Sequence, residues 1–194
     1  MALALFLALA ATAPPSVEAA AARFGPALVT VRWADAGESA GFFVASSGTA
    51  VAVVPAGVSE VVIELAGGAR RAGRVVVRGA EGLALVELAR KPDEAPRLPA
   101  LAVAEQDRVL APEVWLVGLG LAEGQAAPSL GGLRRVDPRG RWRLDLPLGP
   151  GAPVLYEGRV VAVVVERDGR TASVALPASR LRALAALRAH PDQP

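Results

Sequence analysis

The feature that most constrains this chain is a recurring pattern of short apolar segments separated by turn residues. Between Phe24 and Pro177, short runs rich in Val, Leu and Ile alternate with Gly, Pro and charged residues. These runs recur at spacings of about ten residues, too short for helices, and their β-branched composition favours strands. The pattern therefore predicts an all-β protein with about a dozen strands, arranged as a barrel or a sandwich.

The predicted strands fall into two groups on either side of a proline-rich, charged stretch. They cover residues 28–33, 41–44, 50–54, 61–65, 74–78 and 83–88 in the first half, and 114–118, 132–136, 141–145, 159–166 and 171–176 in the second. Gly67-Gly68 indicates a tight hairpin turn, and only the segment after Pro177 has helical spacing, with Ser179 as a candidate N-cap. We therefore predict two six-stranded barrels at 23–89 and 100–177, a linker at 90–99, and a C-terminal helix and tail at 178–194.

The first 22 residues have features of an export signal. Leu3–Ala13 is an apolar run of the length of a signal-peptide core and is too short to span a bilayer. Pro14-Pro15 ends it, and Val17 and Ala19 supply small residues before a cleavage point. Met1-Ala2 lacks the usual basic residues, so an atypical signal, a mis-assigned start, a retained anchor and a buried helix stay open. We expect a periplasmic or secreted protein with no integral membrane span after signal removal.

Two residue types that support much of protein chemistry are nearly absent. The 194 residues include no cysteine and one histidine, which excludes zinc fingers, Cys-ligated iron–sulfur clusters, disulfides and Cys–His nucleophile pairs. The histidine, His190, lies in a polar C-terminal end where a catalytic base is not expected. We expect no metal and no cofactor. The formal net charge is only +2, so we interpret the arginine clusters as solvated strand faces and expect no nucleic-acid partner.

Five segments, taken in chain order, match the pattern of a known family. They are Ser39–Val44, Val61–Leu88 with its Leu-Ala-Leu strand, Val114–Gly118, Gly151–Val163 with its Gly-Ala-Pro-Val start, and Val174–Pro177. Their order and spacing resemble the trypsin-like serine proteases of the high-temperature-requirement (Deg) type. The resemblance covers about Phe24 to Leu187 and implies two β-barrels in series, with the catalytic site between them.

The residues that would carry catalysis do not match that family. Pro55 stands where the family has its histidine, Gly82 where it has the aspartate before Leu-Ala-Leu, and Pro150 where it has the serine of Gly-Asn-Ser-Gly-Gly-Pro-Leu. The resemblance therefore implies a member without a catalytic triad. Pro150 also lacks the backbone N–H with which the nucleophile residue would contribute to the oxyanion hole.

We therefore predict a catalytically inactive protease homologue, a binding or structural module of the envelope with a protein or peptide partner. The family holds peptides partly by strand addition beside the second barrel. The resemblance implies a groove formed by Leu148, Gly149, Gly151, Ala152, Val174 and Ala175.

Two alternatives stay open. One is an active hydrolase with an unconventional site, and the other is an architectural subunit of an envelope complex. The candidate groups for an unconventional site are hydroxyls and carboxylates at Ser46, Ser47, Ser129, Ser173, Glu81 and Asp145. Without a histidine or lysine nearby, Glu81 is a poor base for activating a serine.

Overall fold

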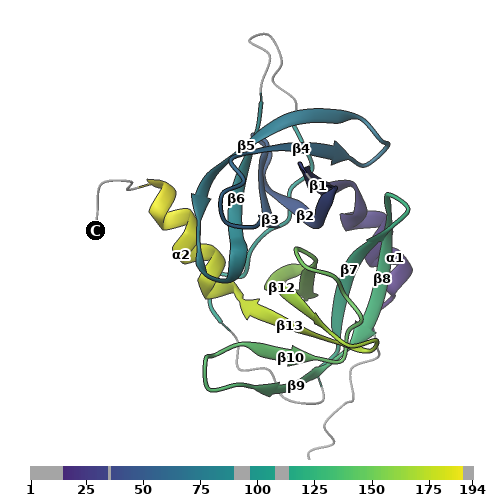
Figure 1. The fold of residues 1–194 in the computed structure, drawn as a ribbon. Helices are drawn as coiled ribbons and strands as arrows, with labels where there is room; N and C mark the ends of the chain where they lie inside the picture. The colour runs from purple at the N-terminus through teal and green to yellow at the C-terminus, as the bar shows by residue number, and fades with distance from the viewer. Residues whose placement is uncertain (1–14, 35, 90–96, 108–113, 190–194) are drawn as a thin grey trace, which may run out of the picture.

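Two β units and two α-helices make up the part of the chain that the computed structural model describes, residues 15–34, 36–89, 97–107 and 114–189 (Figure 1). Helix α1 (Val17–Phe24) and the 3-10 helix η1 (Gly25–Ala27) precede the first unit, and α2 (Ala178–Ala189) follows the second. No helix in these residues is long and apolar enough to cross a membrane. Residues 90–96 of the predicted linker, and His190, lie outside the described residues.

The first unit is a closed antiparallel barrel, as the sequence predicts. Its strands follow the order β1-β2-β3-β6-β5-β4, and the 3-10 helix η2 (Ala80–Gly82) joins the fifth to the sixth. The predicted hairpin turn is confirmed, because the Leu65 N–H donates to the Ala69 carbonyl at 2.8 Å. The strands are β1 (Leu28–Trp33), β2 (Gly37–Ala45), β3 (Thr49–Val53), β4 (Glu60–Leu65), β5 (Arg70–Arg78) and β6 (Leu83–Leu88).

The second unit is a curled seven-stranded sheet rather than the predicted six-stranded barrel. The sheet order is β8-β7-β11-β12-β13-β10-β9. Because only Gly132 separates β8 from β9, the two outer strands are halves of one bent strand, and the sheet curls back on itself. The strands are β7 (Leu116–Ala122), β8 (Gln125–Gly131), β9 (Leu133–Val136), β10 (Trp142–Leu144), β11 (Pro153–Tyr156), β12 (Arg159–Asp168) and β13 (Ala172–Pro177).

Two features explain the break and why the strand pattern missed β8. A Cβ on Gly131 would lie 2.1 Å from the Asp145 carbonyl oxygen, so only glycine allows the chains to approach so closely at the bend. β8 also contains Pro128, which cannot donate a ladder hydrogen bond and argues against a strand. The structure accommodates it because β8 pairs with β7 alone, with Leu119 opposite Pro128.

Buried apolar side chains form three clusters. One fills the first barrel and includes Val31 and Ile63, and one fills the second sheet and includes Trp142 and Leu144. The third lies between the units and takes residues from both, among them Phe42, Leu83, Leu119, Val163 and Leu184. The two β units therefore share a core and pack as one body.

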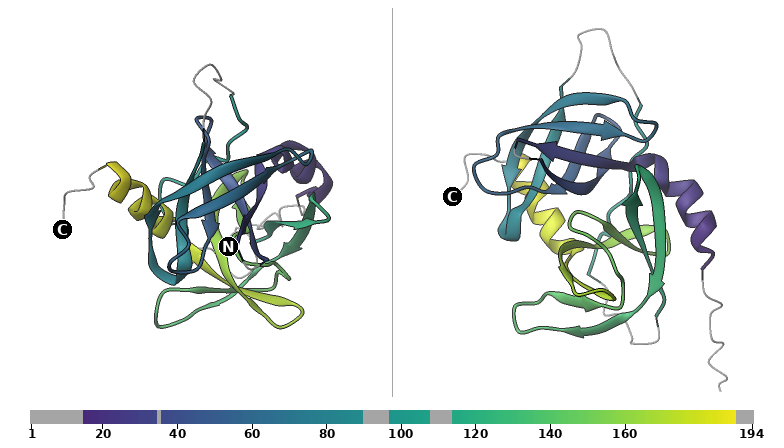
Figure 2. Two further views of the ribbon diagram at one scale, coloured as in Figure 1. Left: turned by 45° about the horizontal axis from the view of Figure 1, so that its top comes forward. Right: turned by 45° about the vertical axis from the view of Figure 1, so that its right-hand side comes forward.

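Helix α1 contains most of the residues next to the predicted cleavage point. The Ser16 hydroxyl accepts from the Ala19 N–H at 3.2 Å and caps its first turn. The side chains of Val17, Ala20, Ala21 and Phe24 pack against the shared core, and the helix lies along β7 and β8 (Figure 2). Residues 17–22, which the sequence assigns to the signal, are thus part of the folded unit, whereas residues 1–14 lie outside the described residues.

Candidate functional site

The segment at the predicted histidine position follows β3 and is held by backbone and guanidinium contacts. The Val54 N–H donates to the Gly82 carbonyl oxygen at 2.8 Å, so Pro55 and Gly82 lie on neighbouring segments. The Arg78 guanidinium donates to the Pro55 carbonyl at 3.0 Å and also to the Val58 carbonyl. Backbone carbonyls and one arginine therefore determine the shape of this loop.

The loop that resembles the nucleophile loop packs against the first barrel. The Ala40 N–H of β2 donates to the Pro150 carbonyl at 3.1 Å, and the Gly151 N–H donates to the Val164 carbonyl at 2.8 Å. Gly151 has a φ of +82°, and a Cβ there would lie 1.7 Å from the Ala40 carbonyl oxygen. Only glycine satisfies both the backbone conformation and this close approach.

The register of the first barrel brings these segments together. Ala40 precedes Gly41, which pairs with Ala52 on β3, three residues before Pro55. Pro55, Gly82 and Pro150 therefore belong to segments that meet where the two β units join. Their own side chains offer no hydroxyl, imidazole or carboxylate.

An ion pair links the two units beside these segments. Glu81, in the left-handed region with a φ of 56°, lies 3.8 Å from the Arg141 guanidinium of the second unit. Arg141 Nε also pairs with Asp137 Oδ2 at 2.7 Å. Partial desolvation of Asp137 is outweighed by hydrogen bonds from the Arg141 N–H, the Arg141 guanidinium and the Arg139 N–H, which together hold the pKa of its carboxyl below the ordinary value. The hydrogen bond to Asp137 raises the pKa of Arg141.

Most of the expected peptide-groove residues are inside the protein. Leu148, Gly151, Ala152, Val174 and Ala175 are buried, and Gly149 is half-buried. β13, which carries Val174 and Ala175, pairs with β12 on one side and β10 on the other. At Val174 and Ala175 the backbone of β13 is therefore paired on both edges and has no position for an added strand.

A free strand edge lies one strand away, on β12. β11 and the loop at Gly151–Ala152 cover β12 only as far as Val164. Val165 lies at a bulge, Glu166 to Asp168 pair with β13 alone, and no described strand covers the other edge of this part of β12. Val165 is half-buried and the next three residues are exposed. This edge begins directly beside the loop that carries Pro150.

The residues proposed for an unconventional site are dispersed. Ser46 and Ser47 lie in the β2–β3 turn, at the end of β3 far from Pro55. Ser129 lies on β8, and Ser173 is fully buried on β13 with no hydrogen-bond partner for its Oγ among the described residues. The structure thus brings none of these serines to the segments around Glu81.

The second candidate carboxylate, Asp145, already has an ion-pair partner. Asp145 is paired with Arg134. The ion pair between Glu81 and Arg141 is therefore the charged contact next to Gly82. Sequence reasoning missed the roles of Arg78 and Arg141. No spacing signals them, because each reaches its partners across the fold rather than along a strand.

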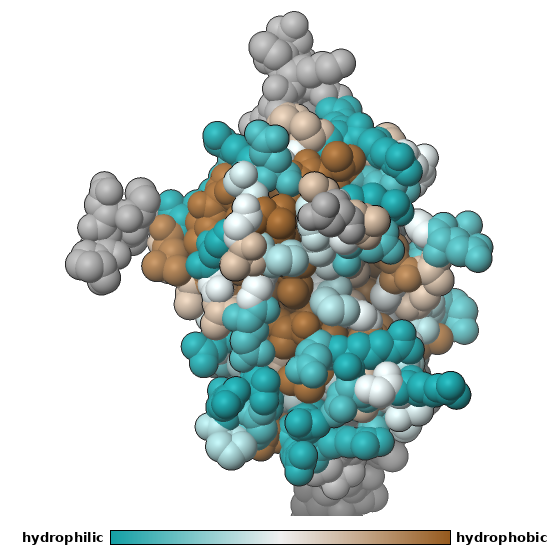
Figure 3. Space-filling model, in the orientation of Figure 1, coloured by the Kyte–Doolittle hydropathy of each residue, from teal (hydrophilic) through white to brown (hydrophobic). Residues whose placement is uncertain are grey.

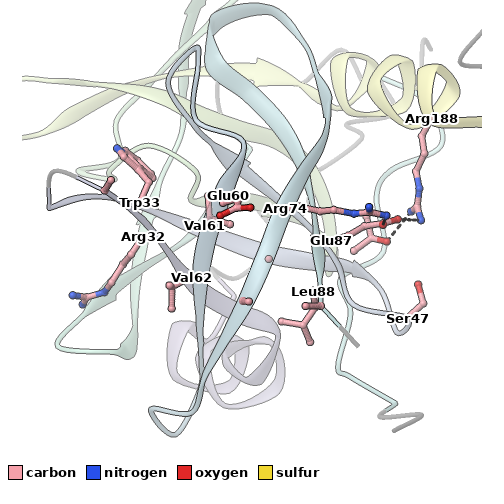
Figure 4. Close-up of a pocket in the computed structure, with 15 residues that line it drawn as sticks. Arg32, Trp33, Ser47, Glu60, Val61, Val62, Arg74, Glu87, Leu88 and Arg188 are labelled. Atoms are coloured by element: carbon pink, nitrogen blue, oxygen red, sulfur yellow. Dashed lines mark hydrogen bonds and ion pairs between the residues drawn. The ribbon is translucent and has the colours of Figure 1, made fainter. Parts of the chain in front are cut away.

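A cavity of about 1130 Å³ opens elsewhere, at the mouth of the first barrel (Figure 4). Trp33 lies at one side of it, and Arg74, Glu87 and Arg188 lie at the other. Arg188 of α2 donates to the Thr49 hydroxyl at 2.7 Å and pairs with Glu87, which Arg74 also contacts at 3.3 Å. None of Pro55, Gly82 and Pro150 lines this cavity. The described residues contain no cluster of three potential metal ligands.

The double-β architecture is that of the trypsin-like serine proteases. Three solved structures resemble it: the HtrA-type protease AlgW with tripeptide (TM-score 0.73, 16% identity), the Rv3671c protease in an inactive form (0.68, 18%), and the serine endoprotease from Yersinia pestis (0.74, 14%). The similarity covers 90–91% of this chain, and it spans 65%, 96% and 67% of those chains respectively. The sequence itself matches no protein-family model and no curated protein. The fold prediction is thus confirmed.

Proposed function

We propose that this protein is a trypsin-like protease homologue without peptidase activity, which acts in the bacterial envelope as a binding or structural module for extended peptides. The observation that carries the proposal is the meeting of the Pro55, Gly82 and Pro150 segments where the two β units join. The protease neighbours support the fold on which these positions are compared.

The chemistry of a serine protease needs groups that these positions do not supply. A hydroxyl becomes a nucleophile when an imidazole takes its proton and a carboxylate orients that imidazole. Proline and glycine side chains do neither. Pro150 also has no N–H for an oxyanion hole, and loss of one such donor alone costs about 3–4 kcal/mol of transition-state stabilisation.

Peptide binding needs much less than peptide cleavage. An extended peptide can add a strand to a free sheet edge through backbone hydrogen bonds alone. The edge of β12 from Val165 to Asp168 offers unpaired backbone next to the Pro150 loop. We place the peptide there, one strand away from the groove expected at Val174 and Ala175.

Two measurements on the full chain test this proposal. A mixture of unstructured peptides is incubated with purified protein, and cleavage is followed by mass spectrometry while backbone hydrogen exchange is followed on the protein. We expect intact peptides and new protection at Val165–Asp168. The amides of Val174 and Ala175, already paired, serve as internal controls and should not change.

Turnover would contradict the first part of the proposal. Cleavage that persists after a second, unrelated purification and that falls in E81Q, D145N or S46A/S47A would show an active hydrolase with an unconventional site. P150S is the matched control, because a hydroxyl without an imidazole should stay inactive. Absence of protection at β12 for every peptide would overturn the peptide-binding part alone.

A further inference from the structure

The cavity at the mouth of the first barrel lies apart from the segments that resemble a catalytic site. Its volume of about 1130 Å³ (Figure 4) is just above the usual range for small-molecule sites, about 300–1,000 Å³. The described residues that line it do not include Val165–Asp168, the edge of β12 where we place a peptide. A ligand in this cavity would therefore be separate from that peptide.

An indole ring forms one side of the cavity. Trp33 ends β1, and a Cβ on Gly37 of β2 would lie 2.0 Å from the Trp33 Nε1. Only glycine therefore lets the ring rest against the backbone of the next strand. Trp33 is half-buried and lines the cavity, so part of its ring is available to a ligand. The face of an aromatic ring carries partial negative charge and attracts polarised C–H groups.

Fixed polar groups form the opposite side of the cavity (Figure 4). Arg188 donates to the Thr49 hydroxyl at 2.7 Å and pairs with Glu87, which Arg74 also contacts at 3.3 Å. We call these four residues the polar wall. Thr49 is only 3% exposed, so the Arg188 side chain is anchored in the barrel. A guanidinium has five N–H donors and a carboxylate about four acceptor positions, and the polar wall therefore keeps donors and acceptors for a ligand.

The charged groups around the cavity already have partners. Arg32, beside Trp33, lies 3.3 Å from Glu38 and 3.5 Å from Glu64, and the two arginines of the polar wall share its one carboxylate. Every arginine of the lining thus has a carboxylate partner. An anionic ligand would have to displace one of these carboxylates, and a cationic ligand would meet three guanidiniums. The cavity therefore suits a neutral ligand.

Two classes of neutral ligand do not suit it. The first barrel is closed, so its strands offer no free edge to which an extended peptide could add. A hydrocarbon would bury the ion pairs of the polar wall without hydrogen-bonding to them, which is costly. Figure 3 shows hydrophilic side chains interspersed with apolar ones over the first unit, a surface that suits a ligand with both kinds of group.

We propose that the barrel-mouth cavity binds a neutral oligosaccharide. A sugar ring has C–H groups on its faces and hydroxyls around its edge, and each hydroxyl both donates and accepts hydrogen bonds. One ring lies on Trp33, and hydroxyls of another ring bond to Glu87 and Arg188. Because the indole and the polar wall lie on opposite sides of the cavity, the site favours several linked sugars over a single one.

The test is calorimetric titration of the full chain with three neutral hexasaccharides: maltohexaose, cellohexaose and chitohexaose. We expect at least one to bind, with an affinity that does not fall as salt rises, because the ligand carries no charge. W33A should lower that affinity about ten-fold or more, and E87Q about ten-fold. W115A removes an exposed tryptophan outside the cavity and is the matched control, which should bind as the unmodified chain does.

A second measurement places the sugar at Trp33. The chain has three tryptophans, so in W115F/W142F the emission comes from Trp33 alone and should change when the hexasaccharide binds. W33F keeps an aromatic ring and should bind more tightly than W33A. Circular dichroism of each variant distinguishes lost binding from lost folding, and the comparison of W33F with the unmodified chain remains if W33A does not fold.

Three results would overturn the proposal. The first is that none of the three hexasaccharides binds. The second is equal affinity of W33A and the unmodified chain with unchanged Trp33 emission, which would place the sugar elsewhere. The third is tighter, salt-sensitive binding of a heparin hexasaccharide at Trp33, which would show that the cavity selects an anion.

Discussion

Single glycines determine how closely the two β units meet. At Gly151 the backbone needs a positive φ, and the site where a Cβ would stand is filled by the Ala40 carbonyl oxygen. Gly124, in the β7–β8 turn, has a similar φ of +76° but open space around the missing Cβ. The two positions therefore separate the cost of backbone conformation from the cost of crowding.

We expect G151A to lower the free energy of unfolding by about 3 kcal/mol, because it adds crowding against β2 to left-handed strain. G124A should cost about 1 kcal/mol, from strain alone. Urea denaturation followed by tryptophan fluorescence measures both. Equal losses for the two variants would show that the Pro150 loop moves away from Ala40 without penalty.

At the level of single residues, the sequence predicts which catalytic side chains are missing better than it predicts which side chains are in contact. It places Pro55, Gly82 and Pro150 in order along the chain, because the neighbouring strands have recognisable patterns. It cannot show that Arg78 binds the carbonyls of that loop or that Arg141 reaches Glu81. An arginine on an exposed strand face looks the same in sequence whether it points into solvent or across to another unit.

Among the structural elements, the β9–β10 hairpin depends on one carboxylate. The hydrogen bonds to Asp137 place its folded-state pKa below the unfolded value of about 3.9. The contribution of Asp137 to stability is therefore fully present at a pH above its unfolded pKa. It is lost as the pH falls through its lower folded-state pKa.

D137N should therefore flatten the loss of stability on acidification below about pH 4. P138A, in the same turn, should keep the slope of the unmodified chain. Thermal unfolding across an acid pH series measures this difference. An unchanged slope in D137N would mean that Asp137 has the same proton affinity in the folded and unfolded chains.

Helix α1 gives a second test at this level. A chain that begins at Ala20, after the predicted cleavage point, lacks the Ser16 cap and Val17. We expect it to be about 2 kcal/mol less stable than a chain that begins at Pro15, from the lost cap and the lost apolar burial. Chemical denaturation of the two chains measures this difference in the free energy of unfolding. Equal stability would show that the start of α1 is dispensable and that cleavage after Ala19 is compatible with the fold.

The strand pattern predicts most strands because their residues either alternate between apolar and polar or are apolar throughout. It fails at β8, where Pro128 and flanking glycines mimic a loop, since the pattern cannot tell an edge position from a central one. It also misses β11, a four-residue strand that begins at Pro153, so it gives five segments for the seven strands of the second unit. Contacts distant in sequence determine both features.

For the whole molecule, the core that the two β units share determines whether they unfold together. Leu119 of β7 is fully buried and belongs to the cluster that contains side chains of both units. The two units should therefore unfold as one, even though each has a core of its own. Trp33 reports on the first unit and Trp142 on the second, once Trp115 is replaced by phenylalanine.

We expect L119A to cost about 3 kcal/mol, through lost burial and the cavity it leaves. The loss should appear in both tryptophan signals, although Leu119 belongs to the second unit. Two reporter chains, W115F/W142F and W33F/W115F, isolate the signals, and urea titration of each with and without L119A gives the midpoints. Equal shifts in the two chains mean that the shared core couples the units. A shift confined to the Trp142 signal would mean that the barrels are independent domains, and that the meeting of Pro55 and Pro150 depends on docking rather than on folding.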